Sequence, residues 1–221
     1  MKIGKFKFDS KNINKGNFRD IFPEFYLLSG TIENDLWHQN QNVYEHTVRV
    51  IFNLERLLDL DFLPNKARVK LKIYLNERID HHLRKDLILI STFLHDMAKK
   101  DTRVIDASGK TSCPAHEVIG GTKVSNFSKR FELTHNEEEI VKKTVSQHAL
   151  VYDFYHLRHK FTELSRIFEL YSTVIGSCQV ELVLLFYSDI LGSDGNKGAP
   201  EEFNICEAIA QRHLKWLSTR V

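Results

Sequence analysis

The sequence predicts an all-α fold, a helical bundle whose functional site lies in the core between helices. Three observations support this class. The chain has only 4 prolines and 10 glycines in 221 residues, so few positions interrupt a helix. Apolar residues recur at three- and four-residue steps, the period of an amphipathic helix. Beyond a possible short hairpin in the exposed segment 101–112, we find no convincing strand pairing, internal repeat or low-complexity tract.

Helices are predicted in order along the chain, beginning with a short one. The predicted segments are 18–28, 42–62, 66–80, 86–99, 115–131, 136–150, 160–175, 178–192 and 201–218. Asp86 can cap the central helix, and Pro200 suits the first turn of the last one. Residues up to Asn17 are polar and are expected to be loosely ordered, whereas 30–41 and 192–198 are expected to be loops.

Length and composition predict a single domain over 1–221, with a core at about 20–195, a polar N-terminal segment and a C-terminal helix. Apolar residues make up 42% and charged residues 27%, as in ordinary soluble globular proteins. The formal net charge of +2 gives no overall signal for nucleic acid or a membrane surface. The oligomeric state cannot be inferred.

The cellular compartment is expected to be the cytoplasm. No apolar stretch is long enough to span a bilayer, and the first residues are too polar for a secretory signal. Three scattered cysteines, Cys113, Cys178 and Cys206, suggest neither a disulfide framework nor a zinc–thiolate site.

The most informative feature is the pair His95 and Asp96, which closes the apolar run 87–94. A helix that is apolar on nearly every side lies inside a fold, and burying an imidazole with a carboxylate is costly unless something pairs with them. Two side-by-side ligands at the end of a buried helix could both reach a metal ion.

Four more polar residues occupy positions where a hydrophobic residue is expected. Each lies on the apolar face of an amphipathic segment, and they are His46, His116, His148 and Asp189. Any one of them alone is more simply a satisfied core residue. All six together favour a metal site, and their imidazoles and carboxylates suit iron, manganese, cobalt, nickel or zinc.

The order His46, His95-Asp96, Asp189 resembles the signature of the HD superfamily of metal-dependent phosphohydrolases. The segments 37–47 and 93–99 and the Ala115-His116-Glu117 run are similar to the HD module of bacterial tRNA nucleotidyltransferases, whose nucleotidyltransferase head this chain lacks. The resemblance covers roughly 20–195. Ala98 stands where a glycine is usual, and the Gly-Tyr-Pro signature of cyclic-dinucleotide phosphodiesterases is absent.

The resemblance implies that His46, His95, Asp96 and Asp189 hold one ion. With His116 and His148 present, it implies a second ion, with Asp96 bridging the pair and acting as the catalytic carboxylate. Metal-activated water would then attack the phosphorus of a nucleotide, a phosphomonoester or a cyclic phosphodiester.

Candidate substrate-binding residues follow from position. Lys99 lies one turn beyond His95, where it could bind phosphate and act in catalysis, or could be a solvated lysine at a helix end. Arg103 and Lys123 are further phosphate candidates, with plain surface charges as the alternative. His38 and Trp37 could line the pocket from the loop before the first ligand.

Other functions remain open. The same six ligands also suit a mixed-valent di-iron oxygenase resembling myo-inositol oxygenase, and a sequence does not show the oxidation state of a metal. A non-catalytic nucleotide- or RNA-binding module is a third reading; the intact ligand set and the lack of a long basic stripe argue against it.

Overall fold

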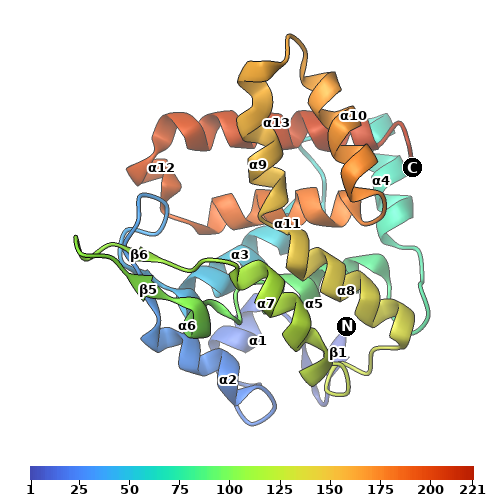
Figure 1. The fold of residues 1–221 in the computed structure, drawn as a ribbon. Coiled ribbons are helices and arrows are strands. Elements are labelled where there is room, and N and C mark those ends of the chain that lie inside the picture. Colours follow the sequence, from blue (N-terminus) through green and yellow to red (C-terminus); the bar gives the residue numbers. More distant parts are fainter.

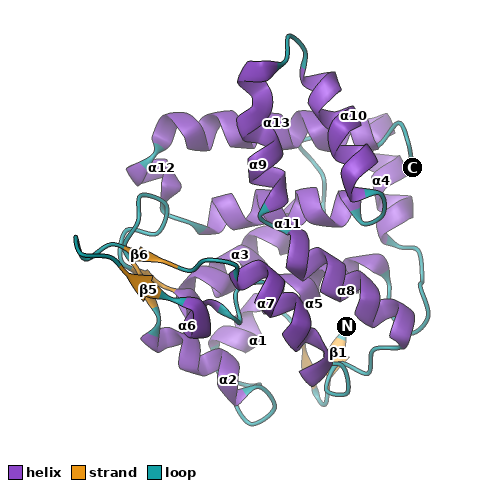
Figure 2. Cartoon of the chain, in the orientation of Figure 1, coloured by secondary structure: helices purple, strands orange, loops and turns teal.

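The computed structural model describes residues 1–221 and confirms the all-α class (Figures 1 and 2). The α-helices are α1 (Ser10–Asn14), α2 (Pro23–Tyr26), α3 (Val43–Leu57), α4 (Asn65–Leu75), α5 (Arg84–Leu94), α6 (Lys99–Thr102), α7 (His116–Lys123), α8 (His135–Gln147), α9 (Leu150–His156), α10 (Leu164–Ile175), α11 (Gln179–Gly192), α12 (Gly195–Gly198) and α13 (Pro200–Leu217). The 3₁₀ helices are η1 (Leu27–Gly30), η2 (Val124–Asn126) and η3 (Leu157–Lys160).

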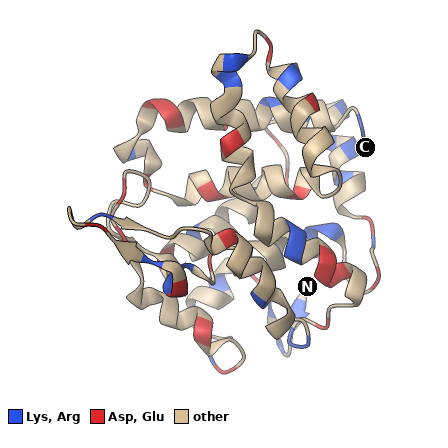
Figure 3. Ribbon diagram, viewed as in Figure 1, with Lys and Arg blue, Asp and Glu red and all other residues tan.

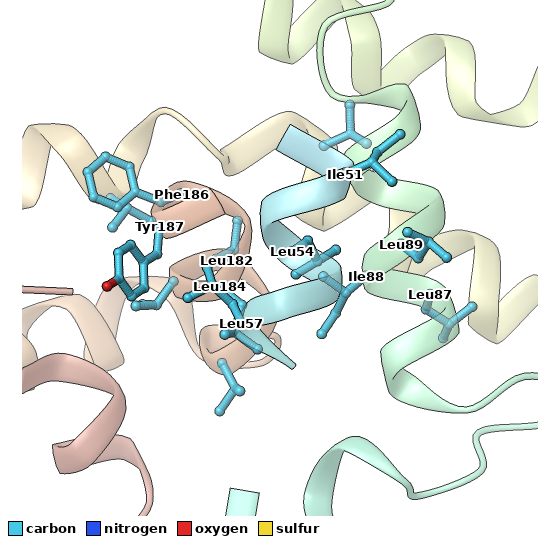
Figure 4. Close-up of a cluster of buried hydrophobic side chains, with 14 of the residues drawn as sticks. Ile51, Leu54, Leu57, Leu87, Ile88, Leu89, Leu182, Leu184, Phe186 and Tyr187 are labelled. Atoms are coloured by element: carbon cyan, nitrogen blue, oxygen red, sulfur yellow. The ribbon is translucent and has the colours of Figure 1, made fainter. Parts of the chain in front are cut away.

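Three helices, α3, α5 and α11, form the centre of the bundle, with α3 between the other two (Figure 4). Every residue of α5 from Leu87 to Leu94 is buried, as its apolar sequence requires. Ile51 and Leu54 of α3 are fully buried beside it. Burying such side chains contributes about 1.5–3 kcal/mol each, so these helices are held firmly in place.

The remaining helices cover this centre. Helix α8 packs on α5 and on α7, while α13 packs on α11 and on the α9–α10 pair (Figure 1). The C-terminal helix therefore closes the side of the bundle formed by α11.

The expectation of a loosely ordered N-terminal segment is wrong. Phe8 and Ile13 are buried, and the Phe8 ring centroid lies 5.2 Å from that of Phe93 on the central helix. Phe6 and Phe8 alternate with charged residues, and the strands β1 (Lys2–Ile3) and β2 (Phe6–Lys7) pair antiparallel. Aromatic burial at widely separated positions outweighs the polar local composition.

Two further antiparallel hairpins are present. The hairpin β5 (Val104–Ile105) and β6 (Thr111–Ser112) lies in the segment where one was considered possible. The hairpin β3 (Ile32–Glu33) and β4 (Gln41–Asn42) lies where only a loop was expected. It brings His38, from the segment between its strands, to the predicted ligand His46, with ring centroids 5.0 Å apart.

Several helix lengths differ from prediction. The central helix ends at Leu94 rather than 99, so His95 and Asp96 follow it in a turn. The segment expected as 115–131 is α-helical only to Lys123. It continues as the 3₁₀ helix η2, and the Phe127 N–H then donates to the carbonyl of Val124, three residues earlier. The helix expected over 160–175 begins at Leu164.

No single helix is long and apolar enough to cross a membrane; α10 and α11 qualify only as a pair, bent by 116°. Figure 3 shows lysines and arginines interspersed with aspartates and glutamates along the chain.

His213 of α13 is a buried histidine away from the predicted ligands. Its ring stacks on Phe168, with centroids 4.1 Å apart, and its Nδ1 and the Tyr155 hydroxyl form a hydrogen bond of 3.1 Å. Burial, with a smaller effect of Arg220, lowers the pKa of His213 to about 3.

We expect this residue to make the fold acid-sensitive. The unfolded chain takes up a proton on His213 below pH 6.5 while the folded chain does not, so stability falls as the pH falls towards 3. Between pH 7 and pH 5 this one group should cost about 2 kcal/mol. Urea unfolding at both pH values checks this; a His213→Phe variant with an undiminished pH dependence would contradict it.

Candidate metal centre

Helix α3 places His46 in the core. The Asn42 side chain caps the helix by accepting a hydrogen bond from the Glu45 backbone N–H at 2.9 Å. His46 then shares a buried face with Val50 and Leu54, four and eight residues on. Only 1% of its surface is exposed, and neither ring nitrogen makes a hydrogen bond.

His95 and Asp96 are buried in the turn after α5. The His95 Nδ1 donates to the Thr92 carbonyl at 2.7 Å, since a carbonyl oxygen can only accept. In the neutral ring this leaves Nε2 as an unprotonated donor atom pointing into the site.

His116 and His148 are oriented in the same way. Their Nδ1 atoms donate to the carbonyls of Cys113 and Val145, each at 2.8 Å. Their Nε2 atoms face one another at 3.3 Å. Two nitrogen lone pairs at this distance repel unless a proton or a metal ion lies between them, so this geometry is compatible with a shared cation.

Asp189, at the C-terminal end of α11, completes the first group of donors. Its Oδ1 lies 2.8 Å from the His46 Nε2 and 3.6 Å from the His95 Nε2. These three side chains offer one ligand atom each, all within 4.8 Å of one another.

Asp96 connects this group with the other two histidines. Its Oδ2 lies 3.3 Å from the His95 Nε2 and 3.5 Å from the His46 Nε2, whereas its Oδ1 lies 3.3 Å from the His116 Nε2. Asp96, His116 and His148 form a second group of three donors within 4.8 Å of one another. The structure thus brings all six predicted ligands together.

Carboxylates are concentrated at this site. Asp96, Asp189 and the nearby Glu33 carry three carboxylates, and the only ammonium among them is that of Lys99. Burial disfavours the charged forms of Asp96 and Asp189, but His95 holds the pKa values of both carboxyls well below their usual range, together with Lys99 at Asp96 and His46 at Asp189. Burial also opposes a charge on His95, yet Asp96 and Asp189 raise its pKa to about 10.

The donor set therefore fits a divalent ion. The His95 Nε2 and both Asp96 oxygens are buried without a hydrogen bond, although an imidazole nitrogen and a carboxylate oxygen lie within 3.6 Å of each other in each of these pairs. Such atoms are costly to bury unless they coordinate something. Imidazoles with carboxylates, without a thiolate, suit the transition metals expected from the sequence.

Comparison with protein-family models identifies the family. The model of the HD domain matches residues 43–170, more than half of the chain. The chain belongs to the HD domain family. Its members are metal-dependent, generally hydrolytic enzymes of a phosphohydrolase superfamily, and they bind divalent metals. The match includes five of the six candidate ligands; Asp189 lies beyond its C-terminal end.

A cavity of about 230 Å³ opens onto the donors of this HD domain. Asp96, His116, His148 and Asp189 line this cavity, whereas His46 and His95 do not. His38 and Lys99 also line the cavity, as do the aromatic side chains of Trp37, Tyr152 and Phe186. Arg103 and Lys123 do not line it; Lys123 instead pairs with Asp101.

Lys99 is not a solvated lysine. Only 5% of it is exposed, and its Nζ lies 2.8 Å from Glu33 Oε2 and 3.0 Å from Asp96 Oδ2. Burial disfavours the ammonium, but the two carboxylates outweigh this effect and raise the pKa of Lys99. A role in phosphate binding remains a prediction.

Sequence reasoning missed Glu33 and Asp35, because both lie in a segment expected to be a loop. Glu33 is buried and holds Lys99, while the Asp35 carboxylate accepts a hydrogen bond from His38 Nδ1 at 2.9 Å. Burial opposes ionisation of Asp35, yet the bonds from His38 lower its pKa to about 2. The turn-forming residues around 34–40 were the available signal for a hairpin.

Replacing Lys99 with methionine should destabilise the fold by about 3 kcal/mol, because Glu33 would lose the partner of a buried ion pair. Urea unfolding measures this loss. The exposed neighbour provides the control, since Lys100→Met should have almost no effect. Adding Glu33→Gln to Lys99→Met should restore part of the stability, because the unpaired carboxylate is removed. Equal stability of Lys99→Met and Lys100→Met would contradict the buried ion pair.

Proposed function

We propose that this HD domain is a phosphohydrolase that holds two divalent ions and acts on a small phosphate ester or nucleotide. The orientation of the Asp96 carboxylate carries the proposal. One of its oxygens faces His46 and His95, and the other faces His116. A carboxylate shared between two donor groups favours a binuclear site, in which His148 serves the second ion.

Bound at this centre, divalent ions would supply Lewis acidity and lower the pKa of water at neutral pH. The chain contributes preorganised ligands. Three of the four histidines are fixed through hydrogen bonds from Nδ1 to a carbonyl three residues earlier. These bonds set both the tautomer and the ring orientation, so the ligands need not rearrange.

Lys99 is positioned to bind a phosphoryl oxygen. An ammonium has three protons to donate; Lys99 donates one to Glu33 Oε2 and forms an ion pair with Asp96. Since Lys99 also lines the cavity, a further proton is available to a substrate oxygen there. The resulting contact would stabilise negative charge that develops during the reaction.

His38 is the proposed proton donor to the leaving group. The charged Asp35 holds its Nδ1, and its Nε2 lies 3.6 Å from Glu33 Oε2 at the cavity wall. A histidine held by a carboxylate in this way can transfer a proton from its other nitrogen. The leaving oxygen would receive that proton as its bond to phosphorus breaks.

A hydrolase assay with defined metals tests the proposal. Protein reconstituted separately with Mn²⁺, Fe²⁺, Co²⁺, Ni²⁺ and Zn²⁺ should release phosphate from at least one class among nucleotides, other phosphomonoesters and cyclic phosphodiesters. Parallel measurement of oxygen uptake separates the oxygenase alternative. Oxygen consumption by an iron-loaded sample that releases no phosphate would overturn the phosphohydrolase proposal.

A further inference from the structure

The cavity has two chemically different halves. The ligands and Lys99 supply its polar lining, and three aromatic side chains supply an apolar wall: Trp37, Tyr152 and Phe186. The Trp37 and Tyr152 ring centroids lie 5.8 Å apart at 88°, and those of Tyr152 and Phe186 lie 6.5 Å apart. A substrate that fills the cavity therefore meets an apolar wall as well as the ligands that would hold its phosphate.

Trp37 is fixed in this wall by a second loop. Its backbone carbonyl accepts a hydrogen bond from the Asp194 backbone N–H at 2.7 Å, and its backbone N–H donates to the Asp35 carboxylate at 2.7 Å. Its ring lies directly on Gly195, where a Cβ atom would come within 2.3 Å of it. Only glycine leaves room for the indole there, so the ring is a preformed surface.

The charges around the cavity limit the phosphates it can accept. Lys99 is its only basic side chain besides the histidines, and Glu33 and Asp96 already pair with it. No arginine lines the cavity. Asp153, beside Tyr152 on α9, adds a carboxylate for which no hydrogen bond or ion pair is found. Phosphates beyond the one held by the metal ions would meet no further cationic side chain in the cavity.

The size of the cavity restricts the substrate further. About 230 Å³ lies below the range of roughly 300–1,000 Å³ typical of pockets for drug-sized ligands. The volume suits one phosphate joined to a small ring system.

We propose that this cavity selects a phosphate monoester whose uncharged leaving group carries an aromatic ring, placed against Trp37 and Tyr152, and that it excludes polyphosphates. This inference rests on the proposed function and assigns Trp37 and Asp153 as specificity-determining residues. A hydroxyl on the leaving group could donate to Asp153.

Kinetics of the metal-loaded enzyme test the role of Trp37. Trp37→Ala should raise KM for 4-nitrophenyl phosphate about tenfold and change KM for glycerol 3-phosphate less than about twofold. Trp37→Phe should restore most of the loss, and Trp216→Phe, outside the cavity, is the matched control. Equal increases in KM for both substrates would overturn the proposal.

Asp153 provides an independent variant because its side chain is exposed and the fold does not depend on it. The wild type should act poorly on ATP, and Asp153→Lys should lower KM for ATP while leaving KM for 4-nitrophenyl phosphate nearly unchanged. Wild-type activity on ATP equal to that on the aromatic monoester would contradict the selection.

Binding measured without turnover separates this inference from the proposed function. By calorimetry, the metal-loaded wild type should bind phenylphosphonate about tenfold more tightly than methylphosphonate, and Trp37→Ala should bind them about equally. If this preference is found but no ester is hydrolysed, the proposed function fails and the aromatic subsite stands. If esters are hydrolysed without the preference, the subsite fails.

Discussion

Asp96→Ala should abolish both metal binding and phosphate release. The Asp96 carboxylate faces both donor groups, so its removal takes a ligand from each ion. Loss of a partner that merely orients a ligand typically costs 10–100-fold in metal affinity, and loss of this shared ligand should cost more than about 100-fold. Elemental analysis of the purified variant, with a phosphatase assay on the same sample, measures both effects.

Asp153→Ala is the matched control for this experiment. Asp153 also lines the cavity with a carboxylate, but it belongs to neither donor group. The control should keep the wild-type metal content, and circular dichroism should show that both variants are folded. Unchanged metal content in Asp96→Ala would show that this carboxylate is not a ligand.

His148→Ala should remove one ion and leave the other. His148 belongs to the donor group with Asp96 and His116, whereas His46, His95 and Asp189 form a complete group without it. The metal content should therefore fall from about two ions per chain to about one. Phosphate release should fall strongly, because attacking and leaving oxygens would no longer be held by a pair of ions.

His159→Ala supplies the control, since this histidine is exposed in η3 and does not line the cavity. It should retain the wild-type metal content and activity. Two ions retained by His148→Ala would contradict the binuclear arrangement, while retention of none would show that the two groups cannot be filled separately.

Helical periodicity predicts both the all-α class and the convergence of the candidate ligands. A helix repeats every 3.6 residues, so a polar side chain such as His46 or His148 on an apolar face must point into the core. Polar groups buried from several directions have to meet partners. The pairing of His116 with His148 across two helices follows only once the packing of α7 on α8 is known.

Other features depend on contacts that local patterns do not reveal. Lys99 has the sequence context of a helix-end lysine, and its burial results from Glu33, which lies 66 residues earlier. Phe8 stands in a polar segment, yet it packs on Phe93. Tyr152 resembles an ordinary core aromatic residue of a helix, and its place in the cavity wall requires the loop that carries Trp37.

The claim on which the account depends is that six distant side chains share a metal centre. Anomalous diffraction from crystals of the metal-loaded protein, collected on both sides of the absorption edge of the added metal, tests it most directly. The account predicts two peaks, one among His46, His95 and Asp189 and one between His116 and His148, with Asp96 touching both. Anomalous peaks found only elsewhere on the protein, or none in crystals grown with the metal, would contradict it.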